Sequence, residues 1–485
     1  MKRLLDQAGR LARAPLYVVG GALRDSALGR AVADLDLAYA GDAEALARAL
    51  ASDSGGSLVV LDDATRVYRV ALEGLQADVA ALQGATIERD LERRDFGVNA
   101  MARPVLPGPG RLGPLIDPRG GLADARARVL RAAGASAFRE DPIRMLRAFR
   151  LSAQLGFGID PGTLRMIRAE RRRIRACAGE RVRTELLALL AVPAAHRLVR
   201  ELDQVRLLTA LFPELEKSRA CARGYYGRGG VLRHTLDALE RLDLLLERLA
   251  RVLPGLEEPI RRHLEAWSGP SAGALLRLSV LLHDVAKPAT ARKIGGRLRF
   301  FGHDERGARL AERELARLRF SRRESDAVAA CVRHHLRPGN LATNDRITPK
   351  AVYRFFRDLR EDGVPLLLVC WADHASYLPA QKLRASLGVL ARDPGPVPAD
   401  PDKGKTVRHL RVIAALLKAY FTQAEVARPQ RMLNGHEVMK TLGIPPGPAV
   451  GRILSRLSEA QATGRVKDRE AALKFISRYK PKKPV

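Results

Sequence analysis

Residues 16–37 read LYVVGGALRDSALGRAVADLDL, and this stretch decides the fold of the first part of the chain. Leu16–Val19 is a short apolar run that ends in Gly20 and Gly21, which is typical of a strand that enters a turn. The alternating segment Leu35–Tyr39 predicts a second strand shortly afterwards. The stretch therefore predicts a small sheet of mixed strands and helices at the start of the chain.

The second half of this stretch carries a pair of carboxylates. Asp34 and Asp36 are two residues apart, so on a strand both side chains lie on one face. Carboxylates that converge in this way repel each other unless a cation joins them, and hard oxygen ligands suit Mg²⁺. The turn at Gly20 and Gly21 exposes backbone N–H groups to an anion, and Arg24 can pair with a phosphate. Two solvated acids after an ordinary turn are the simpler alternative, but the combination favours phosphoryl or nucleotidyl transfer with two metal ions.

Two further segments supply candidate partners for this site. Asp78, in the apolar-flanked segment QADVA, is the best candidate for a third carboxylate on a neighbouring strand. The segment RDLERRDFGVNAMA at residues 89–102 adds Arg94 and Asp95, followed by Asn99 in an apolar stretch. Alone, this segment is a charged cap on an amphipathic helix. Beside the carboxylate pair, it supplies a guanidinium for triphosphate oxygens and an amide for a sugar or a phosphate.

A third charged cluster predicts a site that recognises a base. The segment FREDPIRMLRAFRLSAQLGF occupies residues 138–157. Asp141 and Arg144 are three residues apart and share a helical face, which Arg147 and Arg150 continue. A carboxylate accepts a hydrogen bond from an exocyclic amino group, and a guanidinium donates to the adjacent ring acceptor. Cytosine and adenine present that edge, whereas uracil and guanine do not. The alternative is an ordinary capped helix with a local ion pair.

The composition narrows the class of partner. Lys and Arg number 84 against 54 Asp and Glu, a net charge of +30. Such a charge favours a nucleic acid or an anionic membrane surface, although a bias toward Arg and Ala from a GC-rich genome explains part of it. No apolar run reaches the length that spans a bilayer, so we expect no membrane insertion. The four cysteines are far apart and form no CxxC pair, as in the thiols of a reducing cytoplasm.

The rest of the chain follows a helical pattern. After about residue 120, apolar residues recur with the spacing of helices nearly to the end. We therefore expect an α+β fold, in which a small head of mixed sheet and helices precedes a long all-α body and a helical tail. Segments rich in Pro and Gly mark the breaks. The predicted parts are a mixed head at 1–135, a helical part that contains the base-recognition cluster at 136–225, a helical part rich in histidine and aspartate at 226–395 and a helical tail at 406–485.

Five segments in this order resemble class II tRNA nucleotidyltransferases, the branch that includes bacterial poly(A) polymerase. They are GGALRD…DLDL, RRDFGVNAMA, DPRGGLADARARVLR at 117–131, REDPIRMLRAFR and GERVRTELLALL at 179–190. The resemblance implies a polymerase-β-like head that uses Mg²⁺ and adds CMP and/or AMP from CTP and ATP to the 3′ end of tRNA without a template. The matching positions are Asp34 and Asp36 for the metal, Gly21, Arg24 and Arg94 for the triphosphate, Asp141 and Arg144 for base selection, and Arg147 and Arg150 for further nucleotide contacts.

One departure from this family bears on the nucleotide that is added. The connection from Asp36 to Arg93 is compact and lacks the Arg-rich flexible loop of many CCA-adding members, a loop associated with the switch from CTP to ATP. A specialist that adds only CC or only A therefore stays open, as does a poly(A) polymerase. Residues 432–479 resemble the tail of related bacterial enzymes, so we expect the tail to bind the tRNA elbow and the head to bind the acceptor end.

A second group of candidate ligands lies in the helical body. Seven of the ten histidines fall between His234 and His374. Imidazole and carboxylate together form a standard ligand set for divalent metals. The order of these residues resembles the HD phosphohydrolase superfamily, a helical fold of metal-dependent phosphatases and phosphodiesterases. On that resemblance the first ion is held by His234, His283, Asp284 and Asp373, and a second by His303 with His334 or its neighbour His335.

The ion of this second site is expected to be nickel, manganese, cobalt, iron or Mg²⁺. Lys287, one helical turn after Asp284, can reach a substrate phosphate. Histidines that are merely hydrogen-bonded in a core are the alternative. A functional site here makes an RNA-end phosphatase or phosphodiesterase, with the head as an RNA-binding module, the competing function from a different class.

Overall fold

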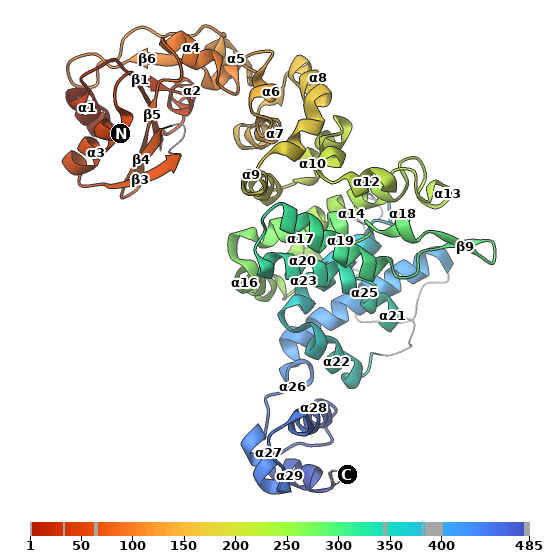
Figure 1. Ribbon diagram of the computed structural model, residues 1–485. Coiled ribbons are helices and arrows are strands. Elements are labelled where there is room, and N and C mark those ends of the chain that lie inside the picture. The colour runs from red at the N-terminus through yellow and green to blue at the C-terminus, as the bar shows by residue number, and fades with distance from the viewer. Residues whose placement is uncertain are drawn as a thin grey trace. The chain divides into compact units, whose positions relative to one another are not determined.

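The computed structural model describes residues 2–32, 34–62, 66–342, 347–379, 381, 383 and 401–479. The chain forms two compact units, Met1–Glu185 with Glu201–Leu211, and Leu186–Arg200 with Phe212–Val485. The first unit carries the main sheet, and the second is a set of packed helices with one short hairpin (Figure 1). The division into four parts that we expect from the sequence stays a prediction.

A mixed sheet organises the first unit. Its strands follow the order β3-β4-β5-β2-β1-β6. Strands β2 and β5 are parallel, and the other neighbouring pairs are antiparallel. The strands are β1 (Leu16–Val19), β2 (Asp34–Tyr39), β3 (Ser57–Asp62), β4 (Val67–Leu72), β5 (Leu75–Ala81) and β6 (Ala102–Pro104). The strands predicted around residues 16–19 and 35–39 are thus confirmed.

The two faces of this sheet differ in chemistry. Leu35 and Leu37 of β2 are buried in an apolar core that also contains Leu46 and Leu50 of helix α3 (Ala43–Ser54). Because side chains alternate along a strand, the residues between them point to the opposite face. That face carries Asp36, which therefore lies outside the apolar core. Helices α1 (Lys2–Leu11) and α3 pack against each other on the apolar side.

Helices follow the sheet in the first unit. They include α2 (Gly21–Ala27), α4 (Ile87–Glu92), the short 3-10 turn η1 (Gly97–Asn99), α5 (Gly121–Ala127), α6 (Ala137–Glu140), α7 (Arg144–Leu155) and α8 (Pro161–Glu170). Helix α9 (Gly179–Ala191) begins in this unit, and its residues from Leu186 on belong to the second unit. The short strands β7 (Val129–Leu130) and β8 (Gly158–Ile159) pair in parallel and interrupt the region expected to be all-helical.

The start of α7 differs from the expectation. Asp141 is extended, with φ −143° and ψ 96°, and lies between α6 and α7 instead of on a shared helical face with Arg144. The reason is Pro142, because the ring of a proline disfavours helical geometry at the residue before it. The carboxylate of Asp141 is consequently placed by a bend in the chain.

The second unit is helical around an apolar core. Its packed helices include α14 (Gly230–Glu247), α17 (Ala272–Leu282), α18 (Lys287–Thr290), α19 (His303–Arg317), α20 (Arg322–His334), α23 (Gly363–Ala375) and α25 (Pro401–Thr422). A hairpin of β9 (Arg292–Ile294) and β10 (Arg297–Arg299) is inserted between α18 and α19. No described helix combines the length and the hydrophobicity needed to cross a bilayer.

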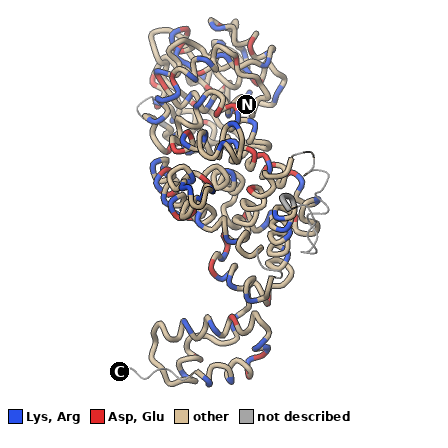
Figure 2. Tube along the Cα trace, turned by 90° about the vertical axis from the view of Figure 1, so that its right-hand side faces the viewer, with Lys and Arg blue, Asp and Glu red and all other residues tan. Residues whose placement is uncertain are grey.

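The last helices of this unit form a small core of their own. Helices α27 (Gly435–Leu442), α28 (Pro448–Ala462) and α29 (Arg469–Ser477) pack around Val438, Ile453 and Leu457. Basic side chains recur along the whole chain, the tail included (Figure 2). The positive charge is therefore spread over both units instead of being confined to one segment.

Candidate active site of the head and candidate metal centre

Three carboxylates meet on the polar face of the head sheet. Asp34 and Asp36 belong to β2, and Asp78 stands directly beside Asp36 in the parallel register of β5. Burial raises the pKa of Asp36; Arg94 opposes this shift, and the neighbouring carboxylates add to it. Asp78 accepts both hydrogen bonds of the Arg69 guanidinium, at 2.7 and 2.8 Å. The structure thus brings the three predicted carboxylates together, in an arrangement whose repulsion a cation would relieve.

The glycine turn lies against these carboxylates. The backbone N–H of Gly21 donates to Oδ2 of Asp36 at 3.1 Å. Gly20 has φ +69°, a region that favours glycine. A Cβ at Gly20 would lie 2.9 Å from Asp36 Oδ2 and 3.1 Å from Nη1 of Arg94. The turn therefore requires glycine for its conformation and for the space that the carboxylate and the guanidinium occupy.

We expect Gly20→Ala to lower kcat/KM for nucleotide addition by about a hundredfold, because the methyl group displaces Asp36 and Arg94 from their positions. Gly29→Ala is the matched control, since Gly29 also has positive φ, +67°, but no atom lies within 4 Å of its added Cβ. Steady-state kinetics on both variants, with thermal unfolding to show that they fold, test this expectation. An equal loss in both variants would contradict it.

A chain of hydrogen bonds links the turn to helix α7. Nη1 of Arg24 donates to Asn99 at 2.7 Å, and the Asn99 amide donates to Asp95 at 3.0 Å. The other oxygen of Asp95 accepts from Arg147 at 2.9 and 3.1 Å. Burial raises the pKa of Asp95, but Arg147 and Asn99 outweigh it and hold that pKa below its usual value. The predicted residues of the second cluster thus fix the direction of Arg24.

The predicted base-selecting pair has a third member. Asp141 accepts from Arg181 at 2.8 and 3.1 Å, whereas Nε of Arg144 is 3.9 Å from its carboxylate. Arg144 instead donates to the backbone carbonyls of Arg93 and Arg94. Arg181 lies in the segment GERVRTELLALL, and no local pattern of the sequence marks it as a partner of Asp141. Arg144 therefore joins α7 to the loop of Arg94, and Arg181 holds the carboxylate.

These side chains surround one cavity of about 620 Å³, a size typical of pockets for small ligands. Of the predicted head residues, the wall includes Gly20, Gly21, Arg24, Asp34, Asp36, Asp78, Arg94, Asp95, Asn99, Asp141, Arg144 and Arg147. Arg150 is not on this wall and forms an ion pair with Glu185. The wall of the cavity therefore combines carboxylates with guanidinium groups, which suits a ligand made of a metal, phosphates and a base.

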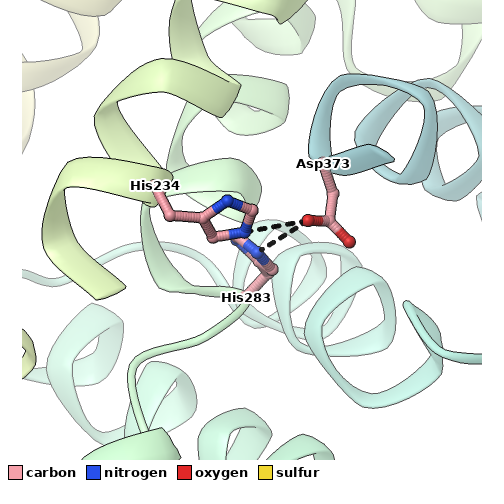
Figure 3. A group of neighbouring side chains, drawn as sticks. All are labelled: His234, His283 and Asp373. Carbon is pink, nitrogen blue, oxygen red and sulfur yellow. Dashed lines mark ion pairs between the residues drawn. The ribbon is translucent and has the colours of Figure 1, made fainter. Parts of the chain in front are cut away.

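The second unit brings together a group of histidines and aspartates. Its members fall into two sets whose candidate ligand atoms lie within 4.8 Å of one another. The sets are His234, His283 and Asp373, and Asp284, His303 and His335. Figure 3 shows the first set, in which Asp373 Oδ1 lies 3.0 Å from Nε2 of His234 and 3.7 Å from that of His283. Together the six residues are called the histidine–aspartate group below.

Asp284 lies between the two sets. Its Oδ2 is 3.2 Å from Nε2 of His283 and 3.6 Å from that of His234. Its Oδ1 is 3.5 Å from Nε2 of His303 and 3.8 Å from that of His335. One carboxylate thus faces four imidazoles, so Asp284 would help to hold an ion in this group.

The far side of each imidazole is fixed by a hydrogen bond. Nδ1 of His283, His303 and His335 donates to the backbone carbonyl three residues earlier, at 2.7, 2.6 and 2.6 Å. Nδ1 of His234 lies 3.0 Å from the hydroxyl of Ser376. Such bonds orient metal-binding histidines and leave Nε2 to face the ion.

Several atoms of the group are buried without a hydrogen-bond partner among the described residues. They are Nε2 of His234 and His283, Oδ1 of Asp284 and Oδ1 of Asp373. Buried polar atoms are costly when they remain unsatisfied. Imidazole nitrogens and carboxylate oxygens that converge in this way fit divalent cations, and a cation at each of the two sets would satisfy them.

The charge states within the group differ strongly. Burial lowers the pKa of His283, but Asp284 and Asp373 outweigh it and raise that pKa to about 10. Burial and the neighbouring His283 lower the pKa of His335 to about 4. The two carboxylates therefore favour positive charge beside them, a role that a bound cation would share.

His334 lies outside the histidine–aspartate group, so its choice as a ligand is corrected to His335. The two residues follow each other at the end of α20, and successive helical side chains point about 100° apart. His335 is buried in the group, whereas His334 is half-buried beside Arg333 and Arg337, which help to lower its pKa after burial does. Sequence order alone does not reveal which of two adjacent histidines faces inward.

The side of the group near α18 carries a lysine and a tyrosine. Lys287 forms an ion pair with Asp284, and its Nζ donates to the Tyr226 hydroxyl at 2.9 Å. The Tyr226 ring stacks on His234 with the ring centres 4.8 Å apart. Lys287, which we expect to contact a substrate phosphate, is therefore already paired with the Asp284 carboxylate and the Tyr226 hydroxyl.

Known protein families match segments that contain most residues of the head cavity and the histidine–aspartate group. Three family descriptions match the chain: "Poly A polymerase head domain" at residues 16–131, "Probable RNA and SrmB-binding site of polymerase A" at 156–218 and "HD domain" at 231–378. In solved structures, the CCA-adding enzyme of Thermotoga maritima complexed with tRNA aligns with a TM-score of 0.63 at 22% identity, over 98% of this chain and 94% of that one. This likeness shows a shared fold.

Curated relatives match over nearly the whole length. The A-adding tRNA nucleotidyltransferase of Deinococcus radiodurans is 34% identical over 96% of each chain. The CC-adding tRNA nucleotidyltransferase of Thermus thermophilus is also 34% identical, over 95% of this chain and 92% of that one. The multifunctional CCA protein of Xanthomonas campestris is 30% identical over 78% and 92%. The chain therefore belongs to the tRNA nucleotidyltransferase family.

Proposed function

We propose that this chain adds CMP and/or AMP to the 3′ end of tRNA, without a nucleic-acid template, from CTP and ATP. The observation that carries the proposal is the cavity of the head, where three carboxylates face a set of arginines. The full-length relatives named as A-adding and CC-adding enzymes support it. They favour a tRNA enzyme over a poly(A) polymerase.

Different residues of the head would bind the metal and the triphosphate during nucleotidyl transfer. Asp34 and Asp36 would hold Mg²⁺, which supplies positive charge to the attacking hydroxyl and to the phosphates when it is bound. The backbone of the glycine turn, Arg24 and Arg94 bind the triphosphate and stabilise the pyrophosphate that leaves. Asp78 completes the carboxylate set when its pair with Arg69 opens.

Asp141 would select the base, and both Arg144 and Arg181 lie near its carboxylate. Asp141 accepts a hydrogen bond from the amino group of cytosine or adenine, which uracil and guanine do not offer at that edge. Arg147 and Arg150 orient the helix that carries Arg144 through their ion pairs. The same carboxylate therefore serves CTP and ATP.

Asp141→Ala is expected to reduce the preference for CTP or ATP over UTP and GTP by about 10- to 100-fold, because the carboxylate that recognises the amino group is lost. The ratio of kcat/KM values across the four nucleotides measures it. Glu170→Ala, which removes an acid that pairs with Arg139 and Arg173 on the surface, is the control and should leave the ratio unchanged. An unaltered ratio in the Asp141 variant would exclude this role.

Addition of a single kind of nucleotide is the narrower form of the proposal. The connection from Asp36 to Arg93 is compact, and within it residues 82–86 alone join β5 to α4, which supports the absence of the loop that the family resemblance associates with the switch from CTP to ATP. Assays of tRNAs that end in the discriminator base, in C and in CC, each with CTP or ATP alone, separate the cases. Incorporation of one nucleotide only supports a specialist, and stepwise CCA synthesis supports the complete enzyme.

The histidine–aspartate group supports a second candidate function, hydrolysis of a phosphate ester at an RNA end. Its unsatisfied buried atoms fit a divalent ion, with nickel, manganese, cobalt, iron and Mg²⁺ as the candidates. When bound, such an ion supplies Lewis acidity toward a phosphate oxygen. Lys287 lies beside Asp284 and is placed to pair with the substrate phosphate. If the head only binds RNA, this hydrolysis is the main activity.

We place the protein in the cytoplasm and in contact with tRNA through both units. All four cysteines are free thiols, as expected in a reducing compartment. The acceptor end would enter the cavity of the head, and the basic helices α28 and α29 of the tail would contact the elbow of the tRNA.

A further inference from the structure

The hairpin β9–β10 carries a concentrated positive charge. Residues 291–302 read ARKIGGRLRFFG, and Gly295 and Gly296 form its tight turn, with φ +56° and +75°. Every strand residue is exposed, and the hairpin extends away from the helices of its unit (Figure 1). Its sequence has four cations and no acid.

Like charges face each other across the two strands of the hairpin. Arg292 and Arg299 are directly opposite each other across the two strands. Like charges in such a pair are destabilising. Neither these two nor Lys293 and Arg297 form an ion pair with any residue that the structure describes. A polyanion that lies along the hairpin would remove this repulsion.

Apolar side chains accompany these cations. Phe301 is 74% exposed, Ile294 51% and Leu298 39%. Exposed aromatic rings beside Arg and Lys are the elements with which proteins bind single-stranded RNA, since bases stack on the ring while the cations contact the backbone. The hairpin presents both elements within one short segment.

The base of the hairpin adjoins the histidine–aspartate group. The segment follows α18, which begins at Lys287, and it ends directly before His303, a member of the group. The carbonyl of Phe300 accepts the hydrogen bond from His303 Nδ1 at 2.6 Å, and Lys287 Nζ lies 5.6 Å from the centre of the Phe300 ring. A single-stranded RNA bound along the hairpin would therefore lie close to the histidine–aspartate group.

We propose that the hairpin at residues 291–302 is an RNA-binding arm, which holds the single-stranded end of an RNA substrate beside the histidine–aspartate group. RNA is the polyanion expected here because the chain belongs to a tRNA nucleotidyltransferase family. The delivery of that end for hydrolysis rests on the proposed hydrolase function, whereas the binding itself does not.

The test compares two double variants that remove the same charge. R292Q/R299Q changes the opposed pair of the hairpin, and R261Q/R262Q changes two exposed arginines that already pair with Glu257 and Glu258 on α16 (Glu257–Ser268). Fluorescence anisotropy gives the Kd of each full-length protein for a labelled RNA of about 12 nucleotides with a 2′,3′-cyclic phosphate, over a series of KCl concentrations.

R292Q/R299Q is expected to weaken binding about tenfold near 100 mM KCl and to reduce the slope of log Kd against log salt by about 1.4, because two phosphate contacts are lost. The control should stay within about twofold of the wild type. Phe301→Ala should weaken binding at least about fivefold without a change of slope. The thermal midpoint of R292Q/R299Q should not fall, since the repulsion across the hairpin is removed.

The outcomes separate the arm from the hydrolase. Unchanged affinity and slope in R292Q/R299Q overturn the arm, as does a loss of binding to anionic phospholipid vesicles with RNA binding intact. Hydrolysis of 2′,3′-cyclic AMP, which is too small to reach the arm, should be equal in wild type and R292Q/R299Q. If the wild type hydrolyses neither substrate with any of the candidate metals, the hydrolase proposal fails, and the arm is still judged by the Kd values.

Discussion

Asp36→Asn is expected to lower kcat for nucleotide addition by at least about a thousandfold while tRNA binding stays within about twofold. Asparagine keeps the size of the side chain and an oxygen that can accept from the Gly21 N–H. It removes the charge that, with Asp34, would hold the metal. Since the three carboxylates repel one another, the variant should unfold at the same temperature as the wild type or a higher one.

The control for this variant is Asp53→Asn. Asp53 lies at the end of α3, outside the cavity, and its carboxylate makes an exposed ion pair with Arg10. The same charge is therefore removed without any expected effect on kcat. Full activity of the Asp36 variant, or an equal loss in the Asp53 variant, would remove the carboxylate pair from the proposed mechanism.

The second large effect is expected in the histidine–aspartate group. Asp284→Asn should abolish metal-dependent hydrolysis of 2′,3′-cyclic phosphates, by at least about a hundredfold, and lower the metal content of the protein. The reason is that both oxygens of Asp284 face imidazoles of the two sets. Nucleotide addition should be unchanged, because none of these residues lines the cavity of the head.

Alanine variants of the adjacent residues His334 and His335 provide a matched control for this prediction. His335→Ala removes an imidazole of the group and should behave like the Asp284 variant, whereas His334→Ala should retain metal and activity. Metal analysis of the purified variants and the hydrolysis assay distinguish them. Equal losses in both histidine variants would show that the effect reflects damage to the end of α20 and not the loss of a ligand.

Local spacing predicted the carboxylates of the head well. The two-residue interval between Asp34 and Asp36 fixes their shared face once β2 is a strand, and the apolar flanks of Asp78 placed it in a neighbouring strand. What the sequence did not show is the pair between Asp78 and Arg69, because it depends on the register of β4 against β5. Such registers are set by tertiary packing and turn geometry.

Several features of the structure were not predicted from the sequence, because they depend on tertiary contacts or on an interruption of the helical pattern. Arg181 reaches Asp141 across 40 positions of sequence, and no local rule selects it among the many arginines. The choice between His334 and His335 requires the rotation of α20 within its bundle. The hairpin at residues 291–302 has a recognisable Gly-Gly turn, but the helical pattern on both sides of it concealed the interruption.

Transfer of nucleotides to tRNA by the head can be measured in a single incorporation assay. The purified full-length protein is incubated with tRNA that lacks its CCA end, with Mg²⁺ and with labelled CTP or ATP. We expect the wild-type protein to add CMP and/or AMP to the 3′ end of the tRNA. We expect the Asp36→Asn variant not to catalyse this addition. Absence of incorporation with either nucleotide, by protein shown to be folded and to bind tRNA, would contradict it.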